Sequence, residues 1–160
     1  MAEMLTDPEI TLLIQEPKPL PAGYRIGMQM KPKRSHHERE IDVRGANGND
    51  FRLILRQSRI NPLDFSAILA YRPPGSTRLF RLRRYNGKSH EHTNTVEKQT
   101  FYDFHVHYAT ERYQMVGASE DSYAEPTDRY GDFQGAVSCL LKECAFEIPT
   151  DPQGRLFEEV

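Results

Sequence analysis

Between about residue 24 and residue 110, apolar and polar side chains alternate in short segments separated by turn-forming Gly, Pro and Asn residues. A period of two residues is typical of β-strands that bury one face and expose the other. The pattern predicts strands over residues 24–31, 40–44, 51–59, 65–71, 78–85 and 100–110, and the last of these can extend to 115. Parallel neighbours need crossovers of a dozen residues or more, so these short connections predict an antiparallel meander.

Helical patterns flank this strand-rich region. Residues 7–15 predict a short helix, because Thr6 or Asp7 can cap it and Pro8 suits its first turn. A second helix is expected at about 131–145, where an apolar stripe recurs at helical spacing. The stripe consists of Phe133, Ala136, Val137, Leu140, Leu141, Cys144 and Ala145. The expected fold is α+β: a mainly antiparallel, curved sheet of about five or six strands, with a short N-terminal helix and a C-terminal helix packed on one face.

The 160 residues are expected to form a single α+β domain. Its parts would be an N-terminal helix with a Pro-rich linker (1–23), the sheet (24–116), an acidic loop with the second helix (117–147) and an irregular tail (148–160). No apolar run approaches the roughly 20 residues that cross a bilayer, and the N-terminus lacks the basic start of a secretory signal. We therefore expect a cytoplasmic protein that does not enter a membrane, with Cys139 and Cys144 reduced and structural.

The strand period also predicts which side chains share a face of the sheet. One set should face the helices: Phe51, Leu53, Leu55, Phe80, Leu82, Tyr102, Phe104, Val106 and Tyr108. The other set should face outward: Arg52, Ile54, Arg56, Arg81, Arg83, Tyr85, Asp103, His105 and His107. If the strands that carry these residues are neighbours, the outward side is an electropositive surface with histidines on it. Such a surface suits a phosphodiester backbone.

Charge is unevenly distributed along the chain, although the formal net charge is only −2. Residues 25–84 contain 14 Lys and Arg against 5 Asp and Glu, whereas residues 85–160 contain 6 against 14. A basic middle followed by an acidic C-terminal part is compatible with an anionic ligand, nucleic acid in particular. The alternative is that arginine simply covers exposed strand faces.

Four of the six histidines form two His-x-His pairs, His90/His92 and His105/His107, and three interpretations of this cluster are open. Two histidines could cleave RNA without metal, one removing the 2′-hydroxyl proton and the other protonating the departing 5′-oxygen. The cluster could instead hold a metal ion, with His105, His107, His90 or His92, and Asp103 as ligands. The histidines could also be structural and bond only to neighbouring backbone and carboxylates.

The order of these residues resembles that of TumE-type bacterial toxins. In that family a turn with Arg, Asn and His precedes a strand with His-x-His, and the matching residues here are Arg84, Asn86, His90 or His92, His105 and His107. The resemblance implies a compact cytoplasmic α+β toxin that acts on RNA and is neutralised by a cognate antitoxin encoded beside it. It is confined to residues 84–107, and the chain departs from the family pattern by Tyr85 in place of an aspartate, by the second His-x-His and by a longer strand-rich N-terminal region.

The favoured hypothesis is a metal-independent endoribonuclease of toxin or defence type that needs no cofactor. Its acid and base would be His105 and His107 with His90 or His92. RNA would contact Arg52, Arg56, Arg81, Arg83, Arg84 and Asn86, and Tyr85 or Tyr108 would stack on a base. The alternative is a non-enzymatic bacterial or phage protein that binds nucleic acid through the basic sheet, or a partner protein through acidic residues such as Glu120 and Asp121. A metal-dependent hydrolase is the third possibility, and the sequence indicates no oligomeric state.

Overall fold

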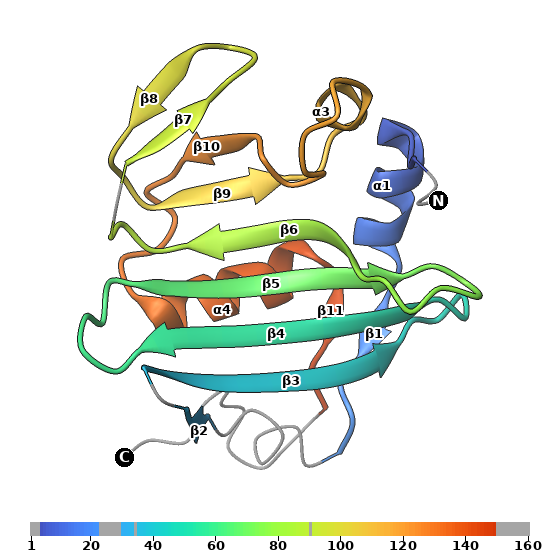
Figure 1. Cartoon of the computed structure of the whole chain (residues 1–160). Coiled ribbons are helices and arrows are strands. Elements are labelled where there is room, and N and C mark those ends of the chain that lie inside the picture. The colour runs from blue at the N-terminus through green and yellow to red at the C-terminus, as the bar shows by residue number, and fades with distance from the viewer. Residues whose placement is uncertain (1–3, 23–29, 34, 90, 150–160) are drawn as a thin grey trace.

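A seven-stranded antiparallel sheet dominates the structure (Figure 1). The computed structural model describes residues 4–22, 30–33, 35–89 and 91–149. The strand order is β10–β9–β6–β5–β4–β3–β2, and each neighbouring pair is antiparallel. The bounds are β2 (Lys31–Pro32), β3 (His36–Arg44), β4 (Asp50–Ser58), β5 (Phe65–Arg72), β6 (Phe80–Asn86), β9 (His105–Tyr108) and β10 (Ala124–Pro126). The expected α+β fold is confirmed, with a meander that has seven strands in this sheet.

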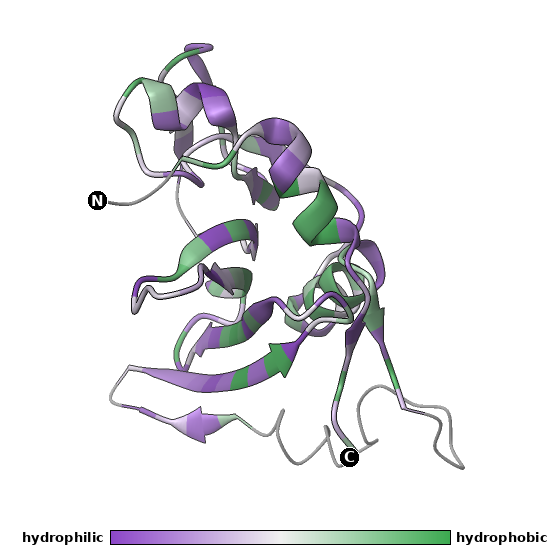
Figure 2. Cartoon of the chain, turned by 90° about the vertical axis from the view of Figure 1, so that its right-hand side faces the viewer, coloured by the Kyte–Doolittle hydropathy of each residue, from purple (hydrophilic) through white to green (hydrophobic). Residues whose placement is uncertain are grey.

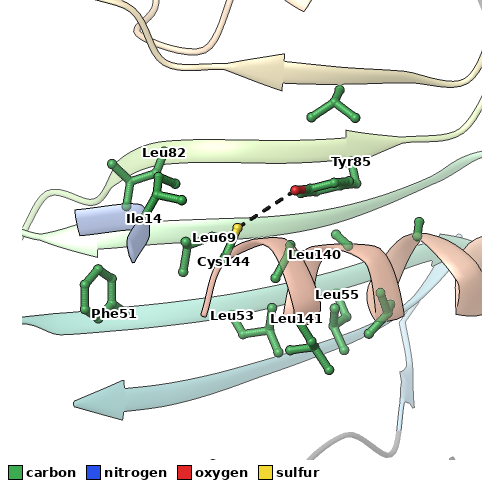
Figure 3. Close-up of a cluster of buried hydrophobic side chains, with 14 of the residues drawn as sticks. Ile14, Phe51, Leu53, Leu55, Leu69, Leu82, Tyr85, Leu140, Leu141 and Cys144 are labelled. Carbon is green, nitrogen blue, oxygen red and sulfur yellow. Dashed lines mark hydrogen bonds between the residues drawn. The ribbon is translucent and has the colours of Figure 1, made fainter. Parts of the chain in front are cut away.

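The core lies between one face of this sheet and helix α4 (Phe133–Glu143). Leu53 of β4 and Leu69 of β5 are fully buried, as are Leu140 and Cys144 at the end of the helix (Figure 3). Burying a leucine side chain contributes about 1.5–3 kcal/mol. Bands of opposite hydropathy alternate along the long strands, as expected for a sheet with one covered face (Figure 2). The predicted apolar stripe of the second helix therefore packs on the sheet as expected.

Helix α1 (Asp7–Gln15) begins with the cap that the sequence predicted. The Thr6 hydroxyl accepts a hydrogen bond from the backbone N–H of Glu9, and the Glu9 carboxylate accepts one from the backbone N–H of Thr6. This reciprocal arrangement satisfies two donors that a helix start leaves without intrahelical partners. The helix buries Ile10, Leu13 and Ile14. After it, β1 (Lys18–Pro19) pairs in parallel with β11 (Phe146–Glu147), so the N-terminal segment is joined to the chain that follows α4.

Lys18 connects the ends of both long helices. Its side chain is fully buried, and its Nζ lies 2.8–2.9 Å from four carbonyl oxygens, which share its three N–H donors. The acceptors are the carbonyls of Leu13, Ile14, Glu16 and Cys144. Carbonyls at a helix C-terminus lack intrahelical partners, and a cation there also interacts favourably with the helix dipole. Burial lowers the pKa of Lys18 to about 8.

The prediction of one strand over residues 100–110 is wrong in one respect, because this segment is divided between two sheets. β8 (Gln99–Phe101) pairs with β7 (His92–Asn94) in a hairpin outside the main sheet, whereas β9 lies between β6 and β10. Tyr102, in the link between β8 and β9, is 56% exposed instead of facing the helices. Residues 111–115 form helix α3 (Glu111–Met115) and do not extend the strand. A run of alternating residues has the same period whichever partner it pairs with, so the pattern could not show this division.

A β-bulge changes the predicted orientation of two side chains in β6. The pairing with β5 shifts register between Leu69 and Ala70, which leaves Leu82 as an extra residue in β6. Beyond the bulge the alternation is displaced by one residue, and Arg83 and Tyr85 lie on the helix side of the sheet. Their expected outward orientation is therefore wrong, because strict alternation does not hold across a bulge.

Three predicted features lie outside the described residues: positions 24–29 of the first expected strand, His90, and positions 150–160 of the tail. Within the described part of the chain, no helix is long and apolar enough to cross a bilayer.

Candidate functional site

Three histidines from two separate sheets meet on the side of the main sheet that faces away from α4, here called the outer face. In register order the outer face carries Arg52, Ile54, Ile68, Arg84, Asn86, His105 and His107. His92 reaches the last two from the hairpin, with ring centroids 5.4 Å from His105 and 4.9 Å from His107. The rings of His105 and His107 are 5.0 Å apart. One ring nitrogen from each histidine lies within 4.8 Å of the others, so the three form one compact cluster, here called the three-histidine centre.

Contacts at and beside its turn hold the β7–β8 hairpin, which carries His92. Asn94, which is 1% exposed, donates from Nδ2 to the carbonyl of Ala124 and accepts the backbone N–H of the same residue. At the hairpin turn, the Tyr113 hydroxyl accepts from the backbone N–H of Val96 and donates to the Glu97 carboxylate. The centre is therefore built on anchored backbone.

The hydrogen bonds of the three rings determine which nitrogen carries a proton. Nδ1 of His105 and of His107 each lie 2.7 Å from a backbone oxygen, that of Asp103 and of Asp121 respectively. A carbonyl oxygen can only accept, so both Nδ1 atoms donate and Nε2 is the nitrogen that can ligate a metal.

The third ring is oriented in the opposite sense. Nε2 of His92 lies 2.8 Å from Oδ1 of Asn94, and the two bonds to Ala124 fix that atom as the amide oxygen. Nε2 of His92 therefore donates, and its Nδ1 is the potential ligand. Metal-binding histidines almost always donate their other N–H to a protein oxygen or water, and all three rings follow this rule.

His107 is uncharged in this environment. It is 3% exposed, and burial together with nearby Arg84, His105 and His92 lowers its pKa to about 2. Nη2 of Arg84 is 3.5 Å from Nδ1 of His107, a contact too long to compete with the 2.7 Å bond to Asp121. A neutral imidazole is the form that binds metal, and it has no proton to give as a general acid from Nε2.

The neutral state of His107 predicts a loss of stability in acid when a chelator is present. In the unfolded chain the His107 imidazole takes up a proton near pH 6.5, whereas in the folded chain it does so near pH 2. Between these pH values the unfolded state binds more protons, so the free energy of unfolding decreases as the pH falls. From pH 8 to pH 5, this group should lower the free energy of unfolding by roughly 2 kcal/mol. Urea denaturation of the wild type and of His107→Gln, whose amide can still donate to Asp121, measures the difference. An equal pH dependence of the two proteins would contradict the prediction.

The cluster agrees in part with the ligands that the sequence suggested for a metal. His92 joins His105 and His107, whereas His90 lies outside the described residues. The Asp103 side chain is exposed and outside the cluster, and this residue contributes its backbone carbonyl to His105. Zn–N bonds of about 2.1 Å place tetrahedral ligand nitrogens about 3.4 Å apart, so each ring needs to shift by less than about 1 Å. A phosphate between two rings would hold their nitrogens further apart, at roughly 5–7 Å.

Carboxylates pair with four arginines of the outer face. The ion pairs are Arg52 with Glu40 and Asp42, Arg56 with Glu38, Arg81 with Glu120 and Asp121, and Arg84 with Asp121. Four arginines thus meet five carboxylates, so the expected electropositive surface is not found here. β6 and β9 are neighbours, β5 separates β6 from β4, and β3 adds a row of acids beside the arginines of β4. The sequence pattern showed the acids of β3 but not that they pair with these arginines.

Arg83 and Tyr85, two residues expected to bind RNA, belong to a polar network on the other side of the sheet. The buried Tyr85 hydroxyl donates to the Glu143 carboxylate at 2.7 Å, and Arg83 packs over the Tyr108 ring. Arg129 also binds Glu143, at 2.8 Å. Tyr108, the other residue expected to stack on a base, is half-buried and contacts Arg83 and Arg129.

Two residues that support the centre were not identified from the sequence. Asn94 stands two residues after His92, and in a strand this spacing places both on one face, so the signal was present. Asp121 gave no such signal, because it lies in an acidic stretch 14 positions from His107 and meets it only through the fold.

Comparisons of the chain with protein-family models, with curated proteins and with solved structures find no significant match. The resemblance of residues 84–107 to TumE-type toxins therefore stays a prediction, and a function has to be argued from the site.

Proposed function

We propose that this protein is a metal-dependent hydrolase, with a zinc-type ion held by His92, His105 and His107. The observation that carries the proposal is the orientation of the three rings. Each donates one N–H to a protein oxygen, as metal-binding histidines do, and one ring nitrogen of each histidine lies within 4.8 Å of the others.

The donor set suits a catalytic ion. Three histidines with a water in the fourth position are a known catalytic arrangement for zinc, whereas structural zinc sites usually have four protein ligands, often including cysteine. Among the described residues, no further His, Cys, Asp or Glu belongs to the cluster. An ion so bound lowers the pKa of its water to about 7, which supplies a hydroxide nucleophile near neutral pH. Burial of His105 and His107 strengthens electrostatic interactions at the centre.

The metal-free ribonuclease mechanism expected from the sequence has less support. It needs one protonated and one neutral histidine, and the lowered pKa of His107 removes that residue as the acid. Binding of a partner protein through Glu120 and Asp121 also lacks support, because these residues pair with Arg81 and Asp121 is only 2% exposed.

Metal content and hydrolysis, measured together, test the proposal. We expect tag-free protein to hold about one zinc or manganese ion per chain by elemental analysis. Hydrolysis of bis(4-nitrophenyl) phosphate or of RNA should be lost in EDTA and restored by the metal. His37→Ala is the control, because His37 lies on β3 away from the cluster and should bind and react as the wild type does. Protein without metal, or hydrolysis that persists in EDTA, would contradict the proposal, and the second result would favour the metal-free mechanism.

A further inference from the structure

The charge balance of the outer face bears on the kind of substrate that the centre can accept. The ion pairs described above leave this face without an excess of positive charge. Binding of a polynucleotide requires several uncompensated cations that displace the counterions of the phosphates. The outer face therefore suits a ligand with one anionic group better than a long polyanion.

Arg84 is one of two arginines on this face whose Nε is buried without a hydrogen bond, the other being Arg72, and only Arg84 is paired with the strand of the three-histidine centre. Its Nε lies 3.3 Å from Oδ2 of Asp121, yet both atoms are buried and make no hydrogen bond with the described residues. Asp121 is also shared, since Nη2 of Arg81 lies 3.3 Å from its other oxygen. Burial and the neighbouring Arg81 lower the pKa of Arg84. Unsatisfied buried polar atoms are rare in proteins, and one use of them is to receive a ligand.

The position of Arg84 connects it to the three-histidine centre. In the β6–β9 pairing, Arg84 is directly opposite His107 and Asn86 is directly opposite His105. The Ser66 hydroxyl donates to Oδ1 of Asn86 at 2.8 Å, so Asn86 can offer its NH₂ group to a ligand. The Arg84 side chain is 28% exposed and can be reached from solvent. A guanidinium and an amide donor thus lie beside the proposed metal position.

We propose that Arg84, assisted by Asn86, binds an oxyanion of the phosphoryl group of a small phosphate-ester substrate at the three-histidine centre. This inference rests on the proposed function for the chemistry at the metal. A tetrahedral phosphoryl group has enough oxygens to contact a metal, a guanidinium and an amide at the same time, and arginine binds phosphate in a bidentate manner. A carboxylate has only two oxygens, which one guanidinium can occupy.

Binding of inorganic phosphate to the zinc-loaded protein, measured by calorimetry in low-salt buffer, tests this role. Arg84→Met retains much of the apolar stem and removes the donors, so phosphate affinity should fall about 10- to 100-fold. Arg52→Met is the matched control, because Arg52 is on the same face but is fully paired with Glu40 and Asp42, and its affinity should stay within about twofold of the wild type. Arg84→Lys keeps a positive charge beside Asp121 and loses the planar guanidinium. If Arg84→Met does not fold, the phosphate affinity of Arg84→Lys, which should also fall, tests the role of Arg84.

The outcomes separate this inference from the proposed function. Unchanged phosphate affinity in both Arg84 variants would overturn the proposed role of Arg84. Acetate that binds as tightly as phosphate would also overturn it. Single-stranded RNA that binds more tightly than phosphate, and that is weakened equally by Arg84→Met and Arg52→Met, would also overturn it in favour of a polyanion surface. If the protein holds no zinc but phosphate binding still depends on Arg84, the proposed hydrolase fails whereas the anion site is supported.

Discussion

Replacement of His107 by alanine should lower zinc affinity by at least about 100-fold. Loss of residues that only support metal ligands already costs about 10- to 100-fold, and loss of a ligand should cost more. In the wild type, free zinc at about 100 times its dissociation constant should raise the free energy of unfolding by about 2.7 kcal/mol. The same zinc concentration should leave the stability of His107→Ala nearly unchanged. Competition with a chromophoric chelator measures the affinity, and urea denaturation with and without zinc measures the stabilisation.

The control for this experiment is another histidine of the same chain. His37→Ala removes an imidazole from β3, so its zinc affinity and its stabilisation by zinc should match those of the wild type. His105→Ala should behave like His107→Ala, because both residues offer Nε2 from the same face of β9. Equal zinc affinity in all these proteins would mean that zinc binds elsewhere.

Replacement of Lys18 by methionine should lower the free energy of unfolding by about 3–5 kcal/mol. Methionine has a similar length, but it leaves four buried carbonyl oxygens without their donor. Two of them, Leu13 and Ile14, end α1, and the Cys144 carbonyl ends α4, so both helices should be affected. Urea denaturation followed by circular dichroism measures the effect.

Lys142→Met is the matched control for Lys18. Lys142 lies in the last turn of α4 with an exposed side chain, so its replacement should change stability by less than about 0.5 kcal/mol. Similar losses in the two variants would show that the buried ammonium has no special role.

The elements that were predicted correctly are those whose signal is local. Helix α1 begins at Asp7, directly after its cap Thr6, and the capping residue, Pro8 and the apolar spacing had all indicated this start. The stripe of α4 predicted a buried helix face, and the turn residues between strands predicted the antiparallel order from β3 to β6. Each of these features depends on residues a few positions apart, so it can be predicted from the sequence alone.

The errors arose where the structure depends on a partner strand. The bulge at Leu82 follows from the pairing of β6 with β5, and it moved Arg83 and Tyr85 to the helix side. The division of residues 100–110 into β8 and β9 depends on β7, a strand of three residues that the pattern did not separate from a turn. Neither event changes the local alternation enough to be seen in the sequence.

By itself, the sequence determined the α+β class, the bounds of α1, the buried face of α4 and the common direction of His105 and His107, because capping, turn chemistry and side-chain periodicity act over short distances. The tertiary structure alone decided that His92 joins them, that Asp121 and Asn94 orient the rings, and that acids of β3 and the loop before β10 neutralise the arginines. The physical reason is that each of these contacts, apart from the one between His92 and Asn94, is made across separate strands or loops. Their distances are set by sheet curvature and hairpin packing, which no local pattern encodes.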